Sequence, residues 1–238
     1  MKLKQVFFFD SSVSLNELKE RFAHLALFAM EQVHDNQVKF LEPKDHPLAF
    51  YPGAFSTIKG VDALVIKKKG VGLIVKHADC LPILITHPSG VIVAVHAGRK
   101  GTEKQILLKT LSLLIERFNL TKNLKVWFGP RICKSCYQIN KETDLHYDLL
   151  EKNINQLELL FKPNQYDLIT HSSCTFCDKH FHSYRREGNG VKMNYSVVVN
   201  GYVWKKQSQK DILNLTSAIK PRKNQDKNIL QARKTMEN

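Results

Sequence analysis

The sequence predicts an α+β fold built in layers. Short apolar runs typical of buried strands recur along the chain, and segments with the apolar stripe of a helix lie between them. The two kinds of element do not alternate as regular βαβ units, which is typical of an α+β fold. The chain contains no Gly-x-Gly-x-x-Gly or Walker loop, so a dinucleotide-binding fold is not indicated.

Length and composition favour a globular cytoplasmic protein. A chain of 238 residues can bury a substantial core. No apolar run approaches the roughly 20 residues that cross a bilayer. The apolar run within Met1–Asp10 is too short for a signal peptide, so we interpret this segment as the first strand. Five cysteines are an odd number, which favours metal binding or reduced thiols over a closed set of disulfides.

The elements follow from local signals. Ser14 and Glu17 form a capping box, which predicts a helix from Ser14 to about Met30. Thr102 and Gln105 repeat this spacing and predict a second helix from Thr102 to Phe118. Prolines and glycines make residues 42–60 a long loop. The remaining predictions are a helix at 141–161 and strands at 61–66, 70–76, 124–129, 166–170 and 197–204.

The most informative stretch is a predicted hairpin between His77 and Thr102. Two apolar runs flank a turn at Pro88-Ser89-Gly90 and read as buried strands. Cys80 opens the first strand and His96 closes the second, so an antiparallel pairing would bring their side chains together. A thiolate and an imidazole are two of the three protein ligands that a catalytic zinc needs.

Seven short motifs, in order along residues 30 to 200, resemble the laccase-domain or polyphenol-oxidase-like family. Members of that family are also described as multifunctional purine nucleoside phosphorylases and adenosine deaminases. The matching motifs are Gln32-Val33-His34, Val61-Asp62-Ala63, Ala78-Asp79-Cys80, His96-Ala97-Gly98, Gly129-Pro130, Cys136-Tyr137 and Ser183-Tyr184-Arg185-Arg186.

The resemblance implies mixed sheets flanked by helices, in a single domain with the metal in a pocket. It implies His34, Cys80 and His96 as the metal ligands, although His34 by itself would be interpreted as a surface loop histidine. Two imidazoles and one thiolate suit zinc, and copper could enter in vitro because of its high affinity for such donors.

Further site residues follow from the same motifs. The resemblance implies catalytic roles for Asp62, Asp79, Lys100 and Arg185, and substrate-binding roles for Gln32, Arg99, Tyr137 and Arg186. Either aspartate could orient a ligand imidazole by hydrogen bonding. A plain turn or cap role for the aspartates, and a solvated surface role for the cations, remain open alternatives.

The predicted function is zinc-dependent purine nucleoside phosphorolysis, with purine nucleoside and phosphate as the partners. Adenosine, inosine or a related nucleoside would react with phosphate to give the base and ribose 1-phosphate, and adenosine deamination would be a second activity. Arg99 and Lys100 precede the predicted Thr102 helix, where free backbone amides and two cations would favour an anion.

The sequence departs from the family at three places. Gly98-Arg99-Lys100-Gly101 stands where the family has Gly-Trp-Arg-Gly, and Gln138 stands where it has a glutamate. The N-terminal region is abbreviated before the first helix. We therefore expect phosphorolysis to exceed deamination, because an amide cannot serve as the acid/base group. A family member that has lost catalysis is an alternative.

Three other chemistries compete. Cys133-x-x-Cys136 and Cys174-x-x-Cys177 could hold a structural zinc with four thiolates in a basic nucleic-acid-binding protein, but 37 residues separate the pairs, more than in a compact zinc ribbon. Cys80 and His96 could form the dyad of a hydrolase, which would not need His34. A copper polyphenol oxidase is the weakest alternative, because a multicopper cluster needs many histidines.

The chain divides into a catalytic domain at residues 1–204 and a basic tail at residues 205–238. The tail carries nine Lys or Arg against three acids, a net charge of +6, within a chain of formal net charge +14. This charge predicts weak, salt-sensitive association with polyanions. The lack of a long apolar run predicts no membrane partner. The sequence does not define the oligomeric state.

Overall fold

The computed structural model describes residues 5–44 and 47–201. The predicted basic tail, and residues 202–204 of the predicted last strand, lie outside the described residues. The elements in chain order are β1 (Val6–Phe9), α1 (Leu15–Arg21), β2 (Ala26–Met30), β3 (Val38–Phe40), η1 (Pro47–Phe50), β4 (Phe55–Ile58), β5 (Ala63–Ile66), β6 (Val71–His77), β7 (Leu81–Thr86), β8 (Ile92–Ala97), α2 (Arg99–Glu103), α3 (Ile106–Phe118), β9 (Leu124–Phe128), η2 (Lys134–Cys136), β10 (Gln138–Asn140), β11 (Leu145–His146), α4 (Leu149–Glu158), η3 (Pro163–Gln165), β12 (Tyr166–Thr170), α5 (Tyr184–Glu187) and β13 (Asn194–Asn200).

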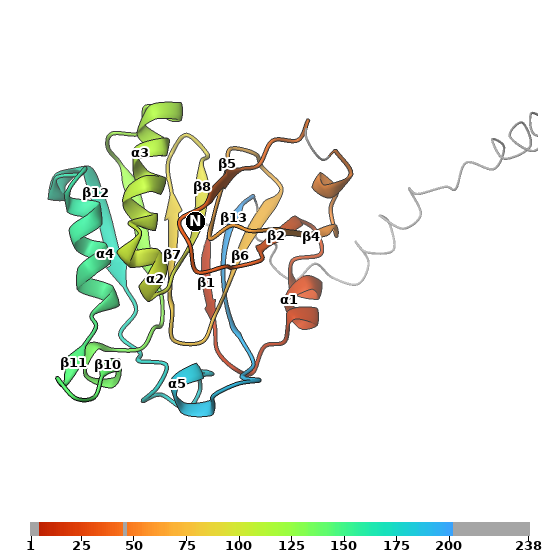
Figure 1. The fold of residues 1–238 in the computed structure, drawn as a ribbon. Coiled ribbons are helices and arrows are strands. Elements are labelled where there is room, and N and C mark those ends of the chain that lie inside the picture. The colour runs from red at the N-terminus through yellow and green to blue at the C-terminus, as the bar shows by residue number, and fades with distance from the viewer. Residues whose placement is uncertain (1–4, 45–46, 202–238) are drawn as a thin grey trace, which may run out of the picture. The chain divides into compact units, whose positions relative to one another are not determined.

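Two mixed sheets form the centre of the domain (Figure 1). The first sheet has the strand order β1-β13-β6-β2-β4, and the second has the order β12-β9-β7-β8-β5-β3. Parallel and antiparallel pairs occur in both: β2 runs parallel to β6, whereas β13 runs antiparallel to it. A two-stranded ribbon, β10-β11, lies outside these sheets. The predicted α+β fold of layered mixed sheets is confirmed.

Successive apolar side chains of a strand point to opposite faces of the sheet, and this alternation forms the layers. Ile92 and Ala94 of β8 belong to the core between the two sheets, and Val93 and Val95 belong to a second core on the other face. This period of two is what a pleated strand buried on both faces requires. Two apolar cores therefore share the second sheet.

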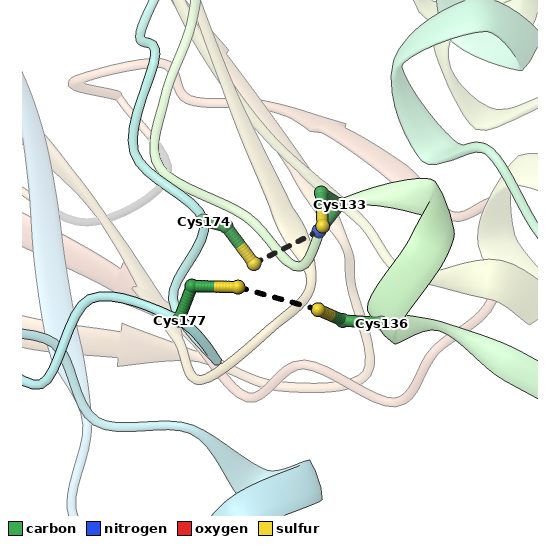
Figure 2. Close-up of side chains that lie close together, drawn as sticks. All are labelled: Cys133, Cys136, Cys174 and Cys177. Atoms are coloured by element: carbon green, nitrogen blue, oxygen red, sulfur yellow. Dashed lines mark hydrogen bonds between the residues drawn. The ribbon is translucent and has the colours of Figure 1, made fainter.

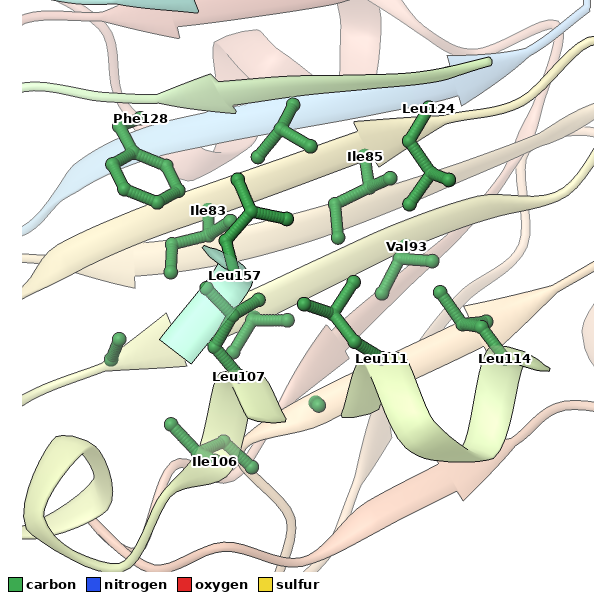
Figure 3. Packing of buried hydrophobic residues seen from close by; sticks show 14 of the residues in the cluster. Ile83, Ile85, Val93, Ile106, Leu107, Leu111, Leu114, Leu124, Phe128 and Leu157 are labelled. Atoms are coloured by element: carbon green, nitrogen blue, oxygen red, sulfur yellow. The ribbon is translucent and has the colours of Figure 1, made fainter. Parts of the chain in front are cut away.

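Helix α3 covers the outer face of the second sheet (Figure 3). Its residues Leu107, Leu111 and Leu114 recur at helical spacing and are fully buried against strand residues such as Ile85 and Val93. Replacing one such leucine by alanine costs about 2–5 kcal/mol. On the outer side of the first sheet, Leu18 of α1 and Phe22, which directly follows α1, belong to a third core. The order of layers is therefore helix, sheet, sheet, helix.

The first predicted helix is wrong beyond Arg21. Ser14 does cap α1, because its side chain accepts a hydrogen bond from the backbone N–H of Glu17. The helix then ends, and residues Ala26–Met30 form β2, which pairs with β6 on one side and β4 on the other. A strand buried on both faces is apolar at every position, so its sequence also fits the apolar stripe of a helix.

The predicted helix from Thr102 is two helices in the structure. Thr102 lies inside the short α2 and is buried, where its hydroxyl accepts a hydrogen bond from the Asn153 side chain. Gln105, in a left-handed conformation at φ 61°, breaks the chain before α3 begins at Ile106. Thr102 is therefore not a helix cap.

Other boundaries also differ. The expected loop at 42–60 contains η1 and β4. The expected helix at 141–161 begins only at Leu149, because Asp148 caps it by accepting hydrogen bonds from two backbone amides of its first turn. The preceding residues form β10 and β11. Within the described residues, no helix combines the length and the apolar character needed to cross a membrane.

Candidate functional site

The predicted hairpin is confirmed and brings Cys80 close to His96. Strands β7 and β8 pair antiparallel, with Leu81 opposite Ala97 and Pro82 opposite His96. Cys80 directly precedes β7, so its side chain lies at the same end of the hairpin as the His96 ring. The tight turn at the other end sets this register, which is why a local sequence pattern could predict it.

His34 reaches the same place from the other sheet. It follows β2 and adopts a left-handed backbone conformation, φ 59°. The carboxylate of Asp62 holds this turn by accepting hydrogen bonds from the backbone N–H groups of Val33 (3.2 Å), His34 (3.0 Å) and Asp35 (2.9 Å). A carboxylate that accepts several backbone N–H bonds fixes a loop firmly, and here that loop presents the His34 ring.

The three side chains form a compact cluster. The Nε2 atom of His34 lies 3.8 Å from Sγ of Cys80, and the rings of His34 and His96 have centroids 4.8 Å apart. One donor atom from each residue lies within 4.8 Å of the others. Gly98 makes this approach possible, because a Cβ atom there would lie 2.9 Å from Sγ of Cys80 and 3.1 Å from Cδ2 of His34.

Asp62 also orients the His96 ring. The two side chains are almost completely buried, and Nδ1 of His96 donates a hydrogen bond of 2.8 Å to the Asp62 carboxylate. Because an ionised carboxylate can only accept, this bond places the hydrogen on Nδ1 and leaves Nε2 for the cluster. Burial opposes ionisation of Asp62, but the hydrogen bonds from His96 and the backbone outweigh burial and lower its pKa.

The electrostatics of the cluster favour a thiolate. Burial raises the pKa of Cys80, but the positive charge of His96 and hydrogen bonds from His34 and His96 outweigh burial and lower the pKa to about 6. Burial likewise opposes protonation of His96, whose pKa rises to about 9 because the Cys80 thiolate and Asp62 stabilise its charge. The metal-free cluster thus holds a thiolate–imidazolium pair near neutral pH.

A cavity of about 1030 Å³ opens beside the cluster. Most of the predicted site residues line it: Gln32, His34, Asp79, Cys80, His96, Arg99, Lys100, Tyr137 and Arg185. Asp62 lies behind His96 and does not line the cavity, and Arg186 does not line it either.

Cations are concentrated in the cavity wall. The Arg185 guanidinium carbon lies 5.5 Å from the centroid of the Tyr137 ring, at cation–π distance. Arg99 donates to Glu103 at 3.1 Å, so part of its charge is already paired. Lys100 is exposed, and within the described part of the chain no acidic side chain forms an ion pair with it or with Arg185. Lys100 and Arg185 are therefore available to an anionic ligand.

Asp79 is a positioning residue for this wall. Its carboxylate accepts hydrogen bonds from the Thr175 hydroxyl (2.7 Å) and from the backbone N–H of Arg185 (2.6 Å). Among the described residues it makes no hydrogen bond to a histidine ring, so the alternative in which it orients a ligand imidazole does not match the structure. Asp79 instead fixes the start of α5, which carries Arg185.

Two expected substrate-binding side chains already form hydrogen bonds within the protein. The Arg186 guanidinium donates to the carbonyl groups of Thr175, Phe176 and Phe181, so its expected contact with a substrate does not match its position. The Gln32 amide bridges the backbone of Lys76, accepting from its N–H at 2.9 Å and donating to its C=O at 2.6 Å. Gln32 lines the cavity, and these bonds fix its amide while using one of its two N–H donors.

The Gln138 side chain faces elsewhere. It donates to Asp144 at 2.7 Å and does not line the cavity. The replacement of the family's glutamate at this position therefore leaves the cavity wall unchanged, and the expectation that it weakens deamination loses its structural basis.

His77 is a cavity residue that the sequence did not single out. It ends β6, is 1% exposed, and shares a hydrogen bond of 2.9 Å between Nε2 and the Ser196 hydroxyl. Its Nδ1 atom has no partner among the described residues. Burial and the positive charges of His96 and His171 lower its pKa to about 3, so the ring is neutral. Its position directly before the Ala-Asp-Cys motif was the available signal.

The fold and the site define a class: layered α+β proteins with a candidate metal centre in a cation-lined cavity. Residues 12–167 match the family described as "Multi-copper polyphenol oxidoreductase laccase", and the chain belongs to this enzyme family. The family resemblance found in the sequence is thereby confirmed.

Two named relatives and one solved structure illustrate what the chain is similar to. A protein named purine nucleoside phosphorylase Cj1217c, from Campylobacter jejuni, is 29% identical over 171 residues, which cover 66% of this chain and 70% of the relative. Adenosine deaminase RL5, from an unknown prokaryotic organism, is 28% identical over 103 residues, 43% of this chain and 39% of the relative. The crystal structure of YlmD from Geobacillus stearothermophilus has a TM-score of 0.67 and 25% identity, covering 78% of each chain.

Proposed function

We propose that the protein is a zinc-dependent purine nucleoside phosphorylase. It would convert adenosine, inosine or a related nucleoside, with phosphate, to the base and ribose 1-phosphate. The observation that carries this proposal is the position of two cations without acidic partners, Lys100 and Arg185, in the same cavity wall as the His34–Cys80–His96 cluster. The names of several relatives support the same substrate class.

The cluster fits a single zinc. Two imidazoles and one thiolate are a donor set that zinc accepts, and three protein ligands are typical of catalytic zinc sites. Gly98 leaves room between the donors that any side chain would fill. When bound, zinc would supply a Lewis acid beside the substrate. Copper could occupy the same donors in vitro, but within the described residues no further histidine joins this cluster, as a multicopper centre would require.

Different residues of the cavity wall would have different roles in phosphorolysis. Lys100 and Arg185 would hold phosphate by charge-assisted hydrogen bonds, and Asp79 would keep Arg185 in place through its backbone. A phosphate oxygen would then attack C1′ of the ribose while the bond from C1′ to the base nitrogen breaks, and the proton carried by the phosphate would pass to that nitrogen as the base leaves. The face of Tyr137, already in contact with Arg185, offers an apolar surface for the nucleoside.

Adenosine deamination is the second candidate activity. It is supported by the relative named adenosine deaminase RL5 and by the same cluster, since metal deaminases use a zinc site of comparable donors. A Cys80–His96 hydrolase remains the rival chemistry, because the thiolate–imidazolium pair would serve as its nucleophile and base. His34 separates the two: its Nε2 atom lies 3.8 Å from the thiol, as a third ligand requires and a dyad does not.

The test is product analysis with and without phosphate. Adenosine plus phosphate should give adenine and ribose 1-phosphate faster than adenosine gives inosine, because Lys100 and Arg185 would supply the anion capture that phosphorolysis needs. His34→Ala should abolish both reactions, whereas His180→Ala, a histidine whose side chain is 85% exposed, should leave both unchanged. Inosine as the main product, or adenine release that does not depend on phosphate, would refute phosphorolysis. Full activity in His34→Ala would favour the dyad.

A further inference from the structure

The four remaining cysteines lie together (Figure 2) and form a group separate from His34, Cys80 and His96. After β9, Cys133 directly precedes η2 and Cys136 is its last residue, and Cys174 and Cys177 follow β12. Their four sulfur atoms lie within 4.8 Å of one another. All four are free thiols, and the Sγ atoms of Cys136 and Cys177 are 3.3 Å apart, too far for the roughly 2.05 Å of a disulfide.

The sheet explains why two distant segments converge. Strands β9 and β12 are neighbours that run parallel and in register, from Tyr166 opposite Leu124 to Thr170 opposite Phe128. The chain therefore leaves both strands at the same edge of the sheet. A parallel bridge between Arg131 and Cys174 continues the pairing into the loops. The 37 residues between the pairs, which argued against a compact zinc ribbon, are used by α4 and β12.

The backbone of each loop turns its two sulfurs to one side. The N–H of Cys136 donates to the carbonyl of Cys133 at 3.1 Å, and the N–H of Asp178 donates to the carbonyl of Cys174 at 2.8 Å. The backbone N–H of Cys133 also donates to Sγ of Cys174 at 3.2 Å. An N–H group that points at a sulfur stabilises the thiolate over the thiol, and the thiolate is the form that binds metal.

Four thiolates packed this closely would repel one another. A bound divalent cation would offset this repulsion. A tetrahedral zinc with bonds of about 2.3 Å would hold its sulfurs about 3.8 Å apart, a separation that the cluster already approaches.

We propose that Cys133, Cys136, Cys174 and Cys177 bind a second, structural zinc. Four protein ligands leave no open position, so this zinc binds no substrate. It clamps the loop after β9 to the loop after β12. This site is independent of the proposed cavity zinc, and no nucleic-acid partner is needed to explain it.

Both loops that this zinc would hold together lie next to the cavity wall. Tyr137 follows Cys136 directly and lines the cavity. In the loop after β12, the carbonyl groups of Thr175 and Phe176 lie inside the Cys174–Cys177 turn. The Arg186 guanidinium donates to both and thereby ties this turn to α5. Because α5 also carries Arg185, the second zinc would hold Tyr137 and Arg185 at their observed separation.

Metal analysis of the full chain tests the proposal. Protein produced with a supply of zinc and then freed of loosely bound metal should contain two zinc ions per chain. Cys133→Ser and Cys177→Ser should each contain one, as should His34→Ala. Ser135→Ala is the matched control: its hydroxyl lies 3.2 Å from Sγ of Cys133 but it supplies no thiolate, so it should retain both ions.

A spectroscopic measurement protects the test against variants that fail to fold. His34→Ala keeps all four thiols, so replacing its remaining zinc with cobalt(II) should give the intense sulfur-to-cobalt bands of a tetrahedral four-thiolate site. The proposal is overturned if His34→Ala binds no zinc, or if mass spectrometry of the native protein shows a Cys136–Cys177 disulfide. Zinc that is lost in Cys133→Ser but unchanged in His34→Ala would support this site and refute the cavity zinc.

Discussion

Nδ1 of His96 donates a hydrogen bond of 2.8 Å to the carboxylate of Asp62, and the same carboxylate holds the backbone of His34. One buried group therefore orients two of the three candidate metal ligands, although it touches neither the cavity nor the thiol. Such a carboxylate sets both the tautomer and the direction of a ligand imidazole.

Asp62→Asn should lower zinc affinity at the cavity site by about 10- to 100-fold, the usual cost of removing such a partner. The amide keeps one acceptor oxygen but loses the charge that favours hydrogen on Nδ1. Competition with a chelator of known affinity measures the change. Asp167→Asn, at a carboxylate that is 69% exposed, is the control and should bind zinc as the wild type does. Equal affinity in Asp62→Asn would show that the hydrogen bond does not orient the ligand.

Cys80 should be reactive at unusually low pH once metal is removed. Its pKa is lowered to about 6, so the thiolate is present above that pH and is lost as the pH falls through it. Alkylation of Cys80 by iodoacetamide, followed by peptide mass spectrometry, should rise as the pH passes about 6 and then level off. The denatured chain is the control and should follow the ordinary thiol pKa near about 8.5. The same midpoint in native and denatured protein would contradict the prediction.

Lys100→Ala should raise the KM for phosphate by about tenfold, because a charge-assisted hydrogen bond contributes about 1.5–3 kcal/mol and Lys100 is partly screened by solvent. The KM for adenosine should change much less. Initial rates at varied phosphate and fixed adenosine, and the reverse, separate the two constants. Lys125→Ala, on the exposed face of β9, is the charge-matched control. Equal losses for both substrates would place Lys100 outside the phosphate site.

Deletion of residues 205–238 should leave nucleoside turnover unchanged and abolish weak binding to polyanions. The tail carries a net charge of +6, and binding that rests on charge alone weakens steeply with salt. Heparin retention of the full and shortened chains at several salt concentrations measures polyanion binding, and the phosphorolysis assay measures turnover. Turnover lost from a folded, shortened chain would assign the tail to the site.

Local signals predicted the parts of the fold that depend on short stretches of chain. The Pro88-Ser89-Gly90 turn and two apolar runs were sufficient to place Cys80 beside His96. The Ser14 cap was sufficient to start α1. The end of α1 was not predictable in this way, because β2 becomes a strand through pairing with β6 and β4, which are distant in sequence.

The site shows the same division between local and distant information. His34 was identified only by resemblance, because the carboxylate that presents it comes from Asp62, on another strand. The meeting of Cys133 with Cys174 depends on the parallel register of β9 and β12, which spacing along the chain does not encode. Arg185 and Arg186 are adjacent and chemically equivalent in the sequence, yet the first faces the cavity and the second binds backbone carbonyls.

The cavity cluster draws its ligands from both sheets. His34 follows β2 of the first sheet, His96 belongs to β8 of the second, and Cys80 lies where the chain crosses from β6 to β7. An ion bound by all three would cross-link the two sheets. Separation of the sheets and release of the ion would then be one linked equilibrium, so that the free energy of metal binding adds to the stability of the folded interior.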